Sequence, residues 1–167
     1  VSFIQSNYTT FGAGVAVPET GISLQNRGAN FSLDPASDNC LAGGKRSYHT
    51  IIPGFLLKDG AAVVPFGVMG AFMQPQGQTE ILVNTLDYHM NPQEALDAPR
   101  IQWIGGRRLE LEREAGEAIA DELRAMGHEV TVVDDRISMG RGQIIWRGED
   151  GVYTAGTEPR CDGAVAA

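Results

Sequence analysis

The segment PGFLLKDGAAVVPFG, residues 53–67, constrains the fold more than any other stretch of the chain. Two apolar runs flank Asp59-Gly60, and an Asp-Gly pair between such runs is a strong signal for a β-hairpin. We therefore expect two antiparallel strands here. Further strands are expected in VSFIQSNY (residues 1–8) and ISLQN (residues 22–26), where β-forming and polar residues mix.

Helical spacing follows the hairpin. Apolar residues recur at helical intervals between residues 81 and 90, and Pro75 favours a helix start beyond it. Asn91 is a good N-cap for a second, short helix, with Pro92 at its first position and Glu94 three residues after the cap. These signals predict two helices in the middle of the chain.

The remaining segments predict one more helix and several strands. The helix covers residues 115–126 and ends at Gly127, which suits a left-handed terminal conformation. Strands are expected at residues 107–112, as a sheet edge, and at residues 128–134, 142–148 and 151–156. Strands, then helices, then strands predict an α+β sandwich in a single domain spanning residues 1–167.

Composition excludes several classes of function. Twenty-one acidic residues against 13 basic ones give a net charge of -8, which opposes binding to nucleic acid. Apolar runs of membrane-spanning length are missing from the sequence, so we expect no membrane partner. Cys40 and Cys161 belong to no metal-binding motif, and free thiols or a disulfide are both compatible with their spacing. The cellular compartment stays open.

Two segments could carry chemistry. In FGVMGAFMQPQG (residues 66–77), Gly67 and Gly70 precede an expected helix, where unpaired backbone N–H groups can bind an anion or a developing oxyanion. An ordinary strand-to-helix turn explains the same pattern. In GGKRSYHTIIPG (residues 43–54), Lys45, Arg46 and His49 crowd a long loop, and such donors could hold a carboxylate. A structural loop histidine is the alternative interpretation of His49.

Six segments occur together in an order that resembles the small subunit of γ-glutamyltranspeptidases. They are TTFGAG, GISLQN, GKRSYHT, FGVMGAFMQPQG, MNPQEALDAPR and EPRCDGAV. The run MGAFMQPQGQ is most similar to the branch that contains cephalosporin acylases. The resemblance implies an N-terminal nucleophile hydrolase fold, an αββα sandwich of two stacked antiparallel sheets flanked by helices.

The resemblance also implies a mechanism. In the family a precursor cuts itself, and the new small subunit starts with a Thr that serves as nucleophile and, through its α-amino group, as base. That Thr would stand roughly a dozen residues before Val1, so we expect residues 1–167 alone to be inactive. Ser6 matches the position whose hydroxyl orients the nucleophile. Gly70 and Ala71 match the paired amides of the oxyanion hole.

The positions that match the substrate pocket depart from the usual transpeptidase pattern. Asn30 replaces the acidic partner of the γ-glutamyl ammonium, and Arg27 replaces a pocket amide. His49 and Thr50 stand where two hydroxyls usually hold the substrate α-carboxylate, and Tyr8 replaces an Asn. Because Arg27 and His49 still favour an anion, we expect a glutaryl amide to be accepted at least as readily as a γ-glutamyl amide.

The resemblance implies no cofactor and no metal. It implies a large subunit of the same precursor as partner, and a dimer of such pairs is possible. The function that the resemblance implies is that of an amide hydrolase or acyltransferase, which cleaves or transfers γ-glutamyl (glutathione-type) or glutaryl amides through a Thr acyl-enzyme. A cephalosporin (glutaryl) acylase-like hydrolase is the nearest alternative. A non-catalytic binding or assembly subunit is the alternative from another class, since the altered pocket permits it.

Overall fold

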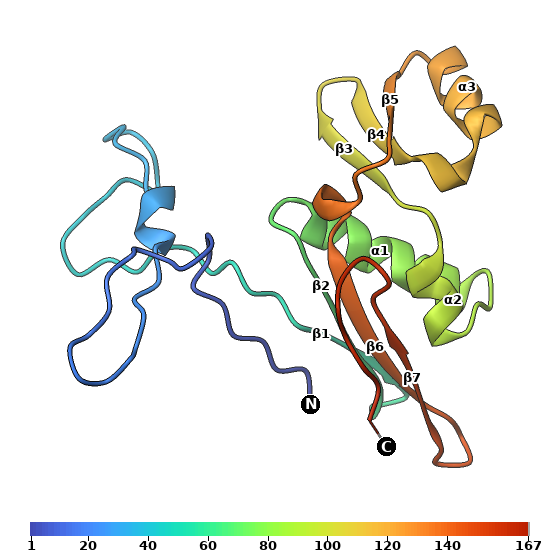
Figure 1. Ribbon diagram of the computed structural model, residues 1–167, viewed down its shortest axis with the longest axis horizontal. Helices are drawn as coiled ribbons and strands as arrows, with labels where there is room; N and C mark the ends of the chain where they lie inside the picture. Colours follow the sequence, from blue (N-terminus) through green and yellow to red (C-terminus); the bar gives the residue numbers. More distant parts are fainter. Residues whose placement is uncertain (167) are drawn as a thin grey trace. The chain divides into compact units, whose positions relative to one another are not determined.

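The computed structural model describes residues 1–166, which divide into two compact units. Unit 2 is Phe3–Ile52, and unit 1 is formed by Val1–Ser2 with the residues from Pro53 onward. Unit 1 contains β1 (Gly54–Lys58), β2 (Ala61–Met69), α1 (Met73–Leu86), α2 (Pro92–Asp97), β3 (Ile101–Gly105), β4 (Arg108–Glu112), α3 (Glu117–Ala125), β5 (Glu129–Val133), β6 (Arg141–Arg147) and β7 (Tyr153–Thr157) (Figure 1). Short 3-10 turns lie at Arg27–Asn30, Arg113–Ala115 and Ile137–Met139. The predicted α+β class is confirmed.

The first sheet is antiparallel, with strand order β1-β2-β6-β7. Its β1–β2 hairpin is the predicted one, and both turn residues have positive φ, 52° at Asp59 and 79° at Gly60. Every second residue near the end of β2 is buried, which gives one apolar face under α1. The core consists of Val64, Phe66, Val68, Ile81, Leu96 and Ile144.

Both central helices form, and one starts earlier than predicted. Pro75 lies in the first turn of α1, where its missing N–H has no helical partner to lose, so the helix begins at Met73. Gly77 faces β2, and a Cβ there would lie 2.8 Å from Val68 Cγ1. In α2 the Asn91 side chain accepts hydrogen bonds from the first turn, and Glu94 returns one, as predicted.

The second sheet has the order β3-β4-β5 and corrects two expectations. β4 pairs antiparallel with β3 but parallel with β5, so this sheet is not wholly antiparallel. The strand predicted as an edge at residues 107–112 is therefore central. The reason is the crossover through α3, which brings β5 back in the same direction as β4. Residues 101–105, which the sequence pattern did not assign, supply the edge strand β3.

Unit 2 differs most from the sequence expectation. Residues 1–7 form no strand, and residues 22–26 contribute only an isolated bridge between Ser23 and Ala16. The segment from Phe3 to Ile52 is built from turns and side-chain hydrogen bonds, and none of its described residues is buried. Cys40 and Cys161 are both free thiols. Among the described helices, none has the length and apolarity needed to cross a membrane.

Four charged side chains form a buried network in unit 1. Arg160 Nε lies 2.6 Å from Glu112 Oε1, and Arg160 Nη1 lies 2.7 Å from Glu158 Oε1. Arg100 Nη2 donates to Glu158 Oε2 at 2.8 Å, and the Arg100 backbone N–H donates to Glu112 at 2.9 Å. Backbone carbonyls at the end of α2 and in the turn before β6 accept further hydrogen bonds from the two arginines. Arg136 Nε also donates to Glu112 at 3.1 Å, and the Gly142 N–H donates to Glu158 at 2.6 Å. We call Arg100, Glu112, Glu158 and Arg160 the charge network.

Glu112 stabilises the fold in a pH-dependent way. Burial alone would raise the pKa of its carboxyl, but hydrogen bonds from Arg160 and from the Arg100 backbone outweigh burial and lower that pKa. A lowered pKa contributes stability that is present above the unfolded pKa of about 4.3 and is lost as the pH falls below it.

We expect Glu112→Gln to destabilise the intact protein by about 3–5 kcal/mol at pH 7, because it leaves buried guanidinium charge uncompensated. Thermal unfolding over pH 3–7 measures this loss, and the difference in unfolding free energy between the variant and the wild type should shrink toward pH 3. A gap that widens at low pH would contradict the role assigned to Glu112.

Glu80 in α1 has the opposite pH dependence. Burial raises the pKa of its carboxyl from the usual 4.5 to about 7, although the charge of Arg100 and a hydrogen bond from the Ile101 backbone lower it. Its Oε2 atom is buried with no hydrogen-bond partner among the described residues. The folded state therefore holds the proton more tightly, and stability falls as the pH rises from 4.5 to 7.

We expect Glu80→Gln to stabilise the protein by up to about 3 kcal/mol at pH 8 and by much less at pH 5, because the amide has no charge to bury. Denaturant unfolding at the two pH values measures the difference. Equal effects at both pH values would show that Glu80 stays ionised throughout.

Candidate active site

The turn between β2 and α1 presents two neighbouring backbone donors. Gly70 has φ 143° and Ala71 has φ 51°. Their carbonyls accept hydrogen bonds from Met73 and Gln74, which starts α1. Within the described residues, the N–H groups of Gly70 and Ala71 donate to no acceptor. Two such donors beside a helix start can bind an anion or an oxyanion.

Close packing fixes this turn. A Cβ on Gly70 would lie 2.8 Å from the Cα of Gly140, and a Cβ on Gly140 would lie 2.8 Å from the carbonyl oxygen of Met69. Ala71 adopts a left-handed conformation that costs an L-residue about 1–2 kcal/mol. Gly67, which the sequence pattern grouped with Gly70, lies inside β2 opposite Gln143 and not in the turn. Gly140 was missed because its role is visible only from its contacts.

Five of the sequence-predicted residues meet in unit 2, and we call them the polar web: Ser6, Tyr8, Arg27, Asn30 and Thr50. Arg27 is its centre. Its Nε donates to Thr50 Oγ1 at 2.6 Å, and its Nη2 donates to the carbonyl oxygen of Ser6 at 3.0 Å and to Ser6 Oγ at 3.2 Å. The guanidinium carbon lies 6.0 Å from the centre of the Tyr8 ring.

Tyr8 links Ser6 to Asn30 within the polar web. Its backbone N–H donates to Ser6 Oγ at 2.9 Å, and its hydroxyl donates to Asn30 Oδ1 at 2.9 Å. The φ of Tyr8 is 80°, an unfavourable value for a bulky residue. The Asn30 carbonyl accepts a hydrogen bond from Asn39 Nδ2 at 2.7 Å. Asn39, which the sequence reasoning missed, thus helps to hold the 3-10 turn at Arg27–Asn30.

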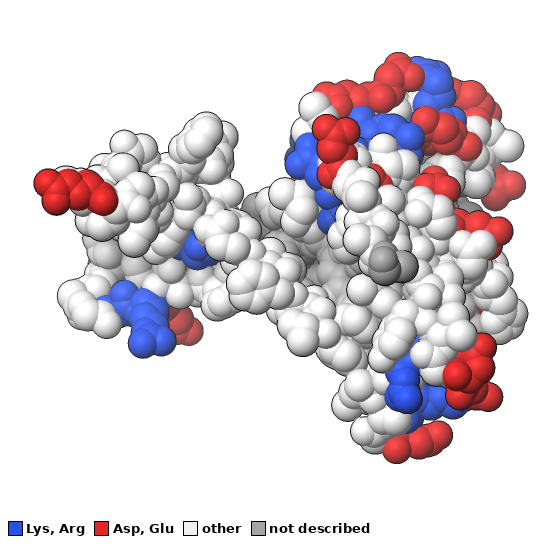
Figure 2. All heavy atoms as spheres, turned by 60° about the horizontal axis from the view of Figure 1, so that its bottom comes forward, with Lys and Arg blue, Asp and Glu red and all other residues white. Residues whose placement is uncertain are grey.

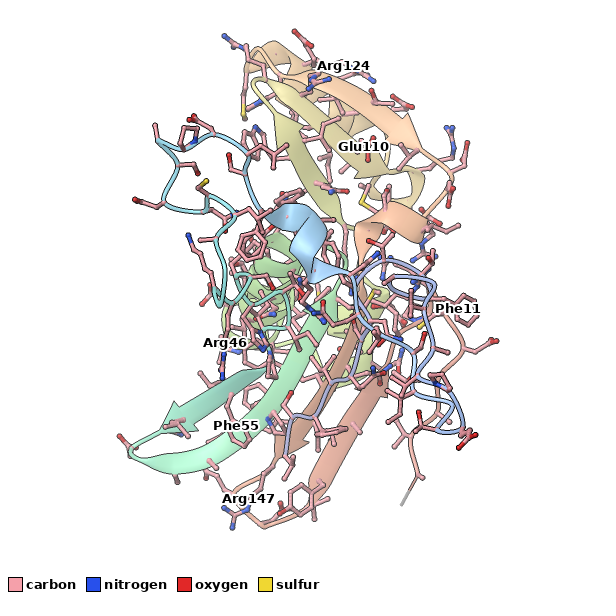
Figure 3. All side chains as sticks on the ribbon, turned by 90° about the vertical axis from the view of Figure 1, so that its left-hand side faces the viewer. Phe11, Arg46, Phe55, Glu110, Arg124 and Arg147 are labelled. Carbon is pink, nitrogen blue, oxygen red and sulfur yellow. The ribbon has the colours of Figure 1, made fainter. Side chains whose placement is uncertain are left out.

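A cavity of about 440 Å³ lies beside the polar web in unit 2. Its lining includes Arg27, Lys45, Arg46 and His49, and contains no Asp or Glu among the described residues. His49 Nδ1 accepts a hydrogen bond from the Ile51 N–H at 3.1 Å. Figure 3 labels Arg46 on the loop that lines this cavity. Excess positive charge makes the cavity suited to an anion.

Not every predicted residue lines the cavity. Arg27 and His49 do, whereas Ser6, Tyr8, Asn30 and Thr50 are placed by their hydrogen bonds around Arg27. Gly70 and Ala71 belong to unit 1 and form their own donor pair. Gln25 and Phe31 also line the cavity, and no sequence signal marks them.

Comparison with known proteins places the chain in a family. The family model described as gamma-glutamyltranspeptidase matches residues 1–167. The chain is 41% identical, over 99% of its length, to the glutathione hydrolase-like YwrD proenzyme of Bacillus subtilis, and 40% identical, over 99%, to the oxamate amidohydrolase proenzyme of Klebsiella pneumoniae. It spans 33% of each of these relatives. The chain therefore belongs to the gamma-glutamyltranspeptidase family.

A solved structure agrees with this assignment. The cephalosporin acylase of Bacillus halodurans matches 98% of this chain with a TM-score of 0.93 and 58% sequence identity, and this chain covers 31% of it. The fold predicted from the six sequence segments, that of the γ-glutamyltranspeptidase and acylase hydrolases, is thus confirmed.

We expect opposite effects from two changes in the β2–α1 turn. Gly70→Ala should lower the free energy of unfolding by about 2 kcal/mol or more, because φ 143° and the contact with Gly140 both oppose a Cβ. Ala71→Gly should raise it by about 1 kcal/mol, since glycine removes the left-handed penalty. Chemical denaturation of both variants measures the pair, and a stabilising Gly70→Ala would contradict this geometry.

Proposed function

We propose that this chain is the small-subunit part of an amide hydrolase or acyltransferase whose substrate carries a carboxylate on its acyl group, such as a glutaryl or γ-glutamyl amide. The observation that carries the proposal is the cavity lined by Arg27, Lys45, Arg46 and His49 without an acidic residue among its described lining. A substrate carboxylate would offset the charge that these side chains concentrate.

The proposed reaction proceeds through an acyl-enzyme. The hydroxyl oxygen of a Thr outside residues 1–167 attacks the amide carbonyl carbon, its α-amino group takes the hydroxyl proton, and the C–N bond breaks as the leaving amine receives a proton. Water or a second amine then attacks the ester and releases the acyl group. The N–H groups of Gly70 and Ala71 are the proposed donors to the oxyanion in both steps.

Asn30 supports the preference for an acyl group without an ammonium. Its Oδ1 already accepts the Tyr8 hydroxyl, and the polar web contains no carboxylate. A γ-glutamyl ammonium near Arg27 would therefore lose about 2–5 kcal/mol relative to one paired with an acid. A glutaryl group has no ammonium and avoids this loss. Oxamate, named for the Klebsiella relative, is likewise an amide that bears a carboxylate.

A cephalosporin acylase-like activity is the second candidate. The 58% identity to the Bacillus halodurans cephalosporin acylase favours it. The cavity supports both candidates equally, because both place a carboxylate-bearing acyl group against Arg27 and His49.

The proposed partner is the remainder of the same precursor. Two relatives of which this chain spans a third are named proenzymes. Unit 2 exposes large apolar side chains, among them Phe11 at 82% and Leu33 at 85% of their full surface. Phe11 projects from its loop in Figure 3, and the face of unit 2 seen in Figure 2 has few charged atoms. Apolar surface of this kind is typical of a protein interface.

Glutaryl and γ-glutamyl anilides, given to the complete enzyme, test the function. We expect kcat/KM for the glutaryl anilide to equal or exceed that for the γ-glutamyl anilide. A preference for γ-glutamyl of more than about a hundredfold, or ~2.7 kcal/mol, would contradict the proposed pocket. Hydrolysis of neither anilide would favour a non-catalytic subunit.

Limited proteolysis tests the partner. Residues 1–167 expressed alone should be cut first within Phe3–Ile52, because this segment buries none of its described residues. The same bonds should be protected when the complete precursor is expressed. Equal protection in both samples would show that unit 2 needs no partner.

A further inference from the structure

The hydrogen bonds around Ser6 determine where its own proton can go. A serine hydroxyl has one O–H donor and two acceptor lone pairs. Ser6 Oγ accepts from the Tyr8 backbone N–H at 2.9 Å and from Arg27 Nη2 at 3.2 Å. Neither donor can accept a hydrogen bond in return. The Ser6 O–H is therefore directed away from both, and it donates to no acceptor among the described residues.

Arg27 has fewer donors left for a substrate than its position in the cavity implies. A guanidinium has five N–H donors, and three of them meet Thr50 Oγ1, Ser6 O and Ser6 Oγ. A bidentate contact with a carboxylate uses parallel N–H groups on two nitrogens. Because Nε and Nη2 are engaged, only the Nη1 end remains, and Arg27 can give a substrate charge and a one-ended contact but not a fork.

We propose that Arg27 is a positioning residue for Ser6: it keeps Ser6 Oγ as an acceptor and so commits the Ser6 O–H to donate to the attacking group. This inference rests on the proposed function, since it assigns the outward proton to the nucleophile of that reaction. The positive φ of Tyr8 serves the same arrangement, because it sets the direction of the Tyr8 side chain relative to its N–H, so that the N–H donates to Ser6 Oγ while the hydroxyl donates to Asn30 Oδ1.

A double-mutant cycle in the complete enzyme separates positioning from substrate binding. With glutaryl anilide, we expect Arg27→Met and Ser6→Ala each to lower kcat by about 10–100-fold, the range for a hydrogen bond to a charged group. In the double variant, Arg27→Met should lower kcat less than about threefold beyond Ser6→Ala, because both act through one hydroxyl. Arg27→Lys should restore little, since an ammonium lacks the planar fork.

Arg46→Met is the matched control. It removes a positive charge from the same cavity lining, yet Arg46 makes no hydrogen bond to the polar web among the described residues. We expect it to raise KM for the glutaryl anilide with little change in kcat. The proposal is overturned if Arg27→Met, like Arg46→Met, raises KM with little change in kcat. It is also overturned if the fall in kcat in the double variant equals the product of the falls in the two single variants.

Amide hydrogen exchange at Tyr8 does not depend on turnover. Arg27→Met and Ser6→Ala should each speed this exchange by about tenfold in the complete protein, because both weaken the hold on Ser6 Oγ, and Arg46→Met should not. Unchanged exchange in Arg27→Met overturns the proposal even in an active enzyme. If no anilide is hydrolysed, the proposed function fails. The exchange rates of the Tyr8 amide then decide by themselves whether Arg27 keeps Ser6 Oγ in place.

Discussion

The buried charge network is the constraint on which unit 1 depends. Arg160 is bound by Glu112 at the end of β4, by Glu158 just after β7 and by carbonyls at the end of α2, so one side chain joins both sheets and a helix. Buried charges of this kind are costly to desolvate and cost more to leave unpaired. Any packing that separates these elements would leave a buried guanidinium or carboxylate without an ion-pair partner. The network therefore opposes any arrangement of the two sheets that would separate these charged side chains.

Local sequence signals predicted most helices and strands of unit 1, and the features that were not predicted depend on contacts between residues far apart in the chain. The hairpin at Asp59-Gly60 and the cap at Asn91 depend on residues adjacent in the chain, so the sequence shows them directly. The parallel pairing of β4 with β5 depends on a crossover through α3, and the predicted strand–helix–strand order over residues 107–134 was the signal that could have indicated it. Arg100 and Arg160 stand in the segments DAPR and EPRC, which supported the family resemblance. The structure supplies their physical reason, since both guanidinium groups meet Glu158.

The local structure of unit 2 could not be predicted from the sequence, because the segment has no periodic apolar face. Its described residues are never fully buried, and its conformation depends on side chains that bond to nearby backbone groups, as Ser6 does with Tyr8. Such bonds give no helix or strand period. The resemblance nevertheless selected Ser6, Tyr8, Arg27, Asn30 and Thr50, and the structure joins these five through hydrogen bonds. Family motifs thus identified residues that periodicity could not.

The two sets of hydrogen-bond donors, the backbone N–H groups of Gly70 and Ala71 and the guanidinium of Arg27, are held in place by different interactions. The turn that carries the N–H groups of Gly70 and Ala71 is fixed by close backbone packing between Gly70 and Gly140, and no polar side chain takes part in that contact. Arg27, by contrast, is held by the Ser6 carbonyl and by two side-chain hydroxyls, so a substitution at Ser6 or Thr50 removes one of its acceptors. In the proposed reaction, the oxyanion donors can therefore keep their geometry while substitutions change the charge preference of the cavity.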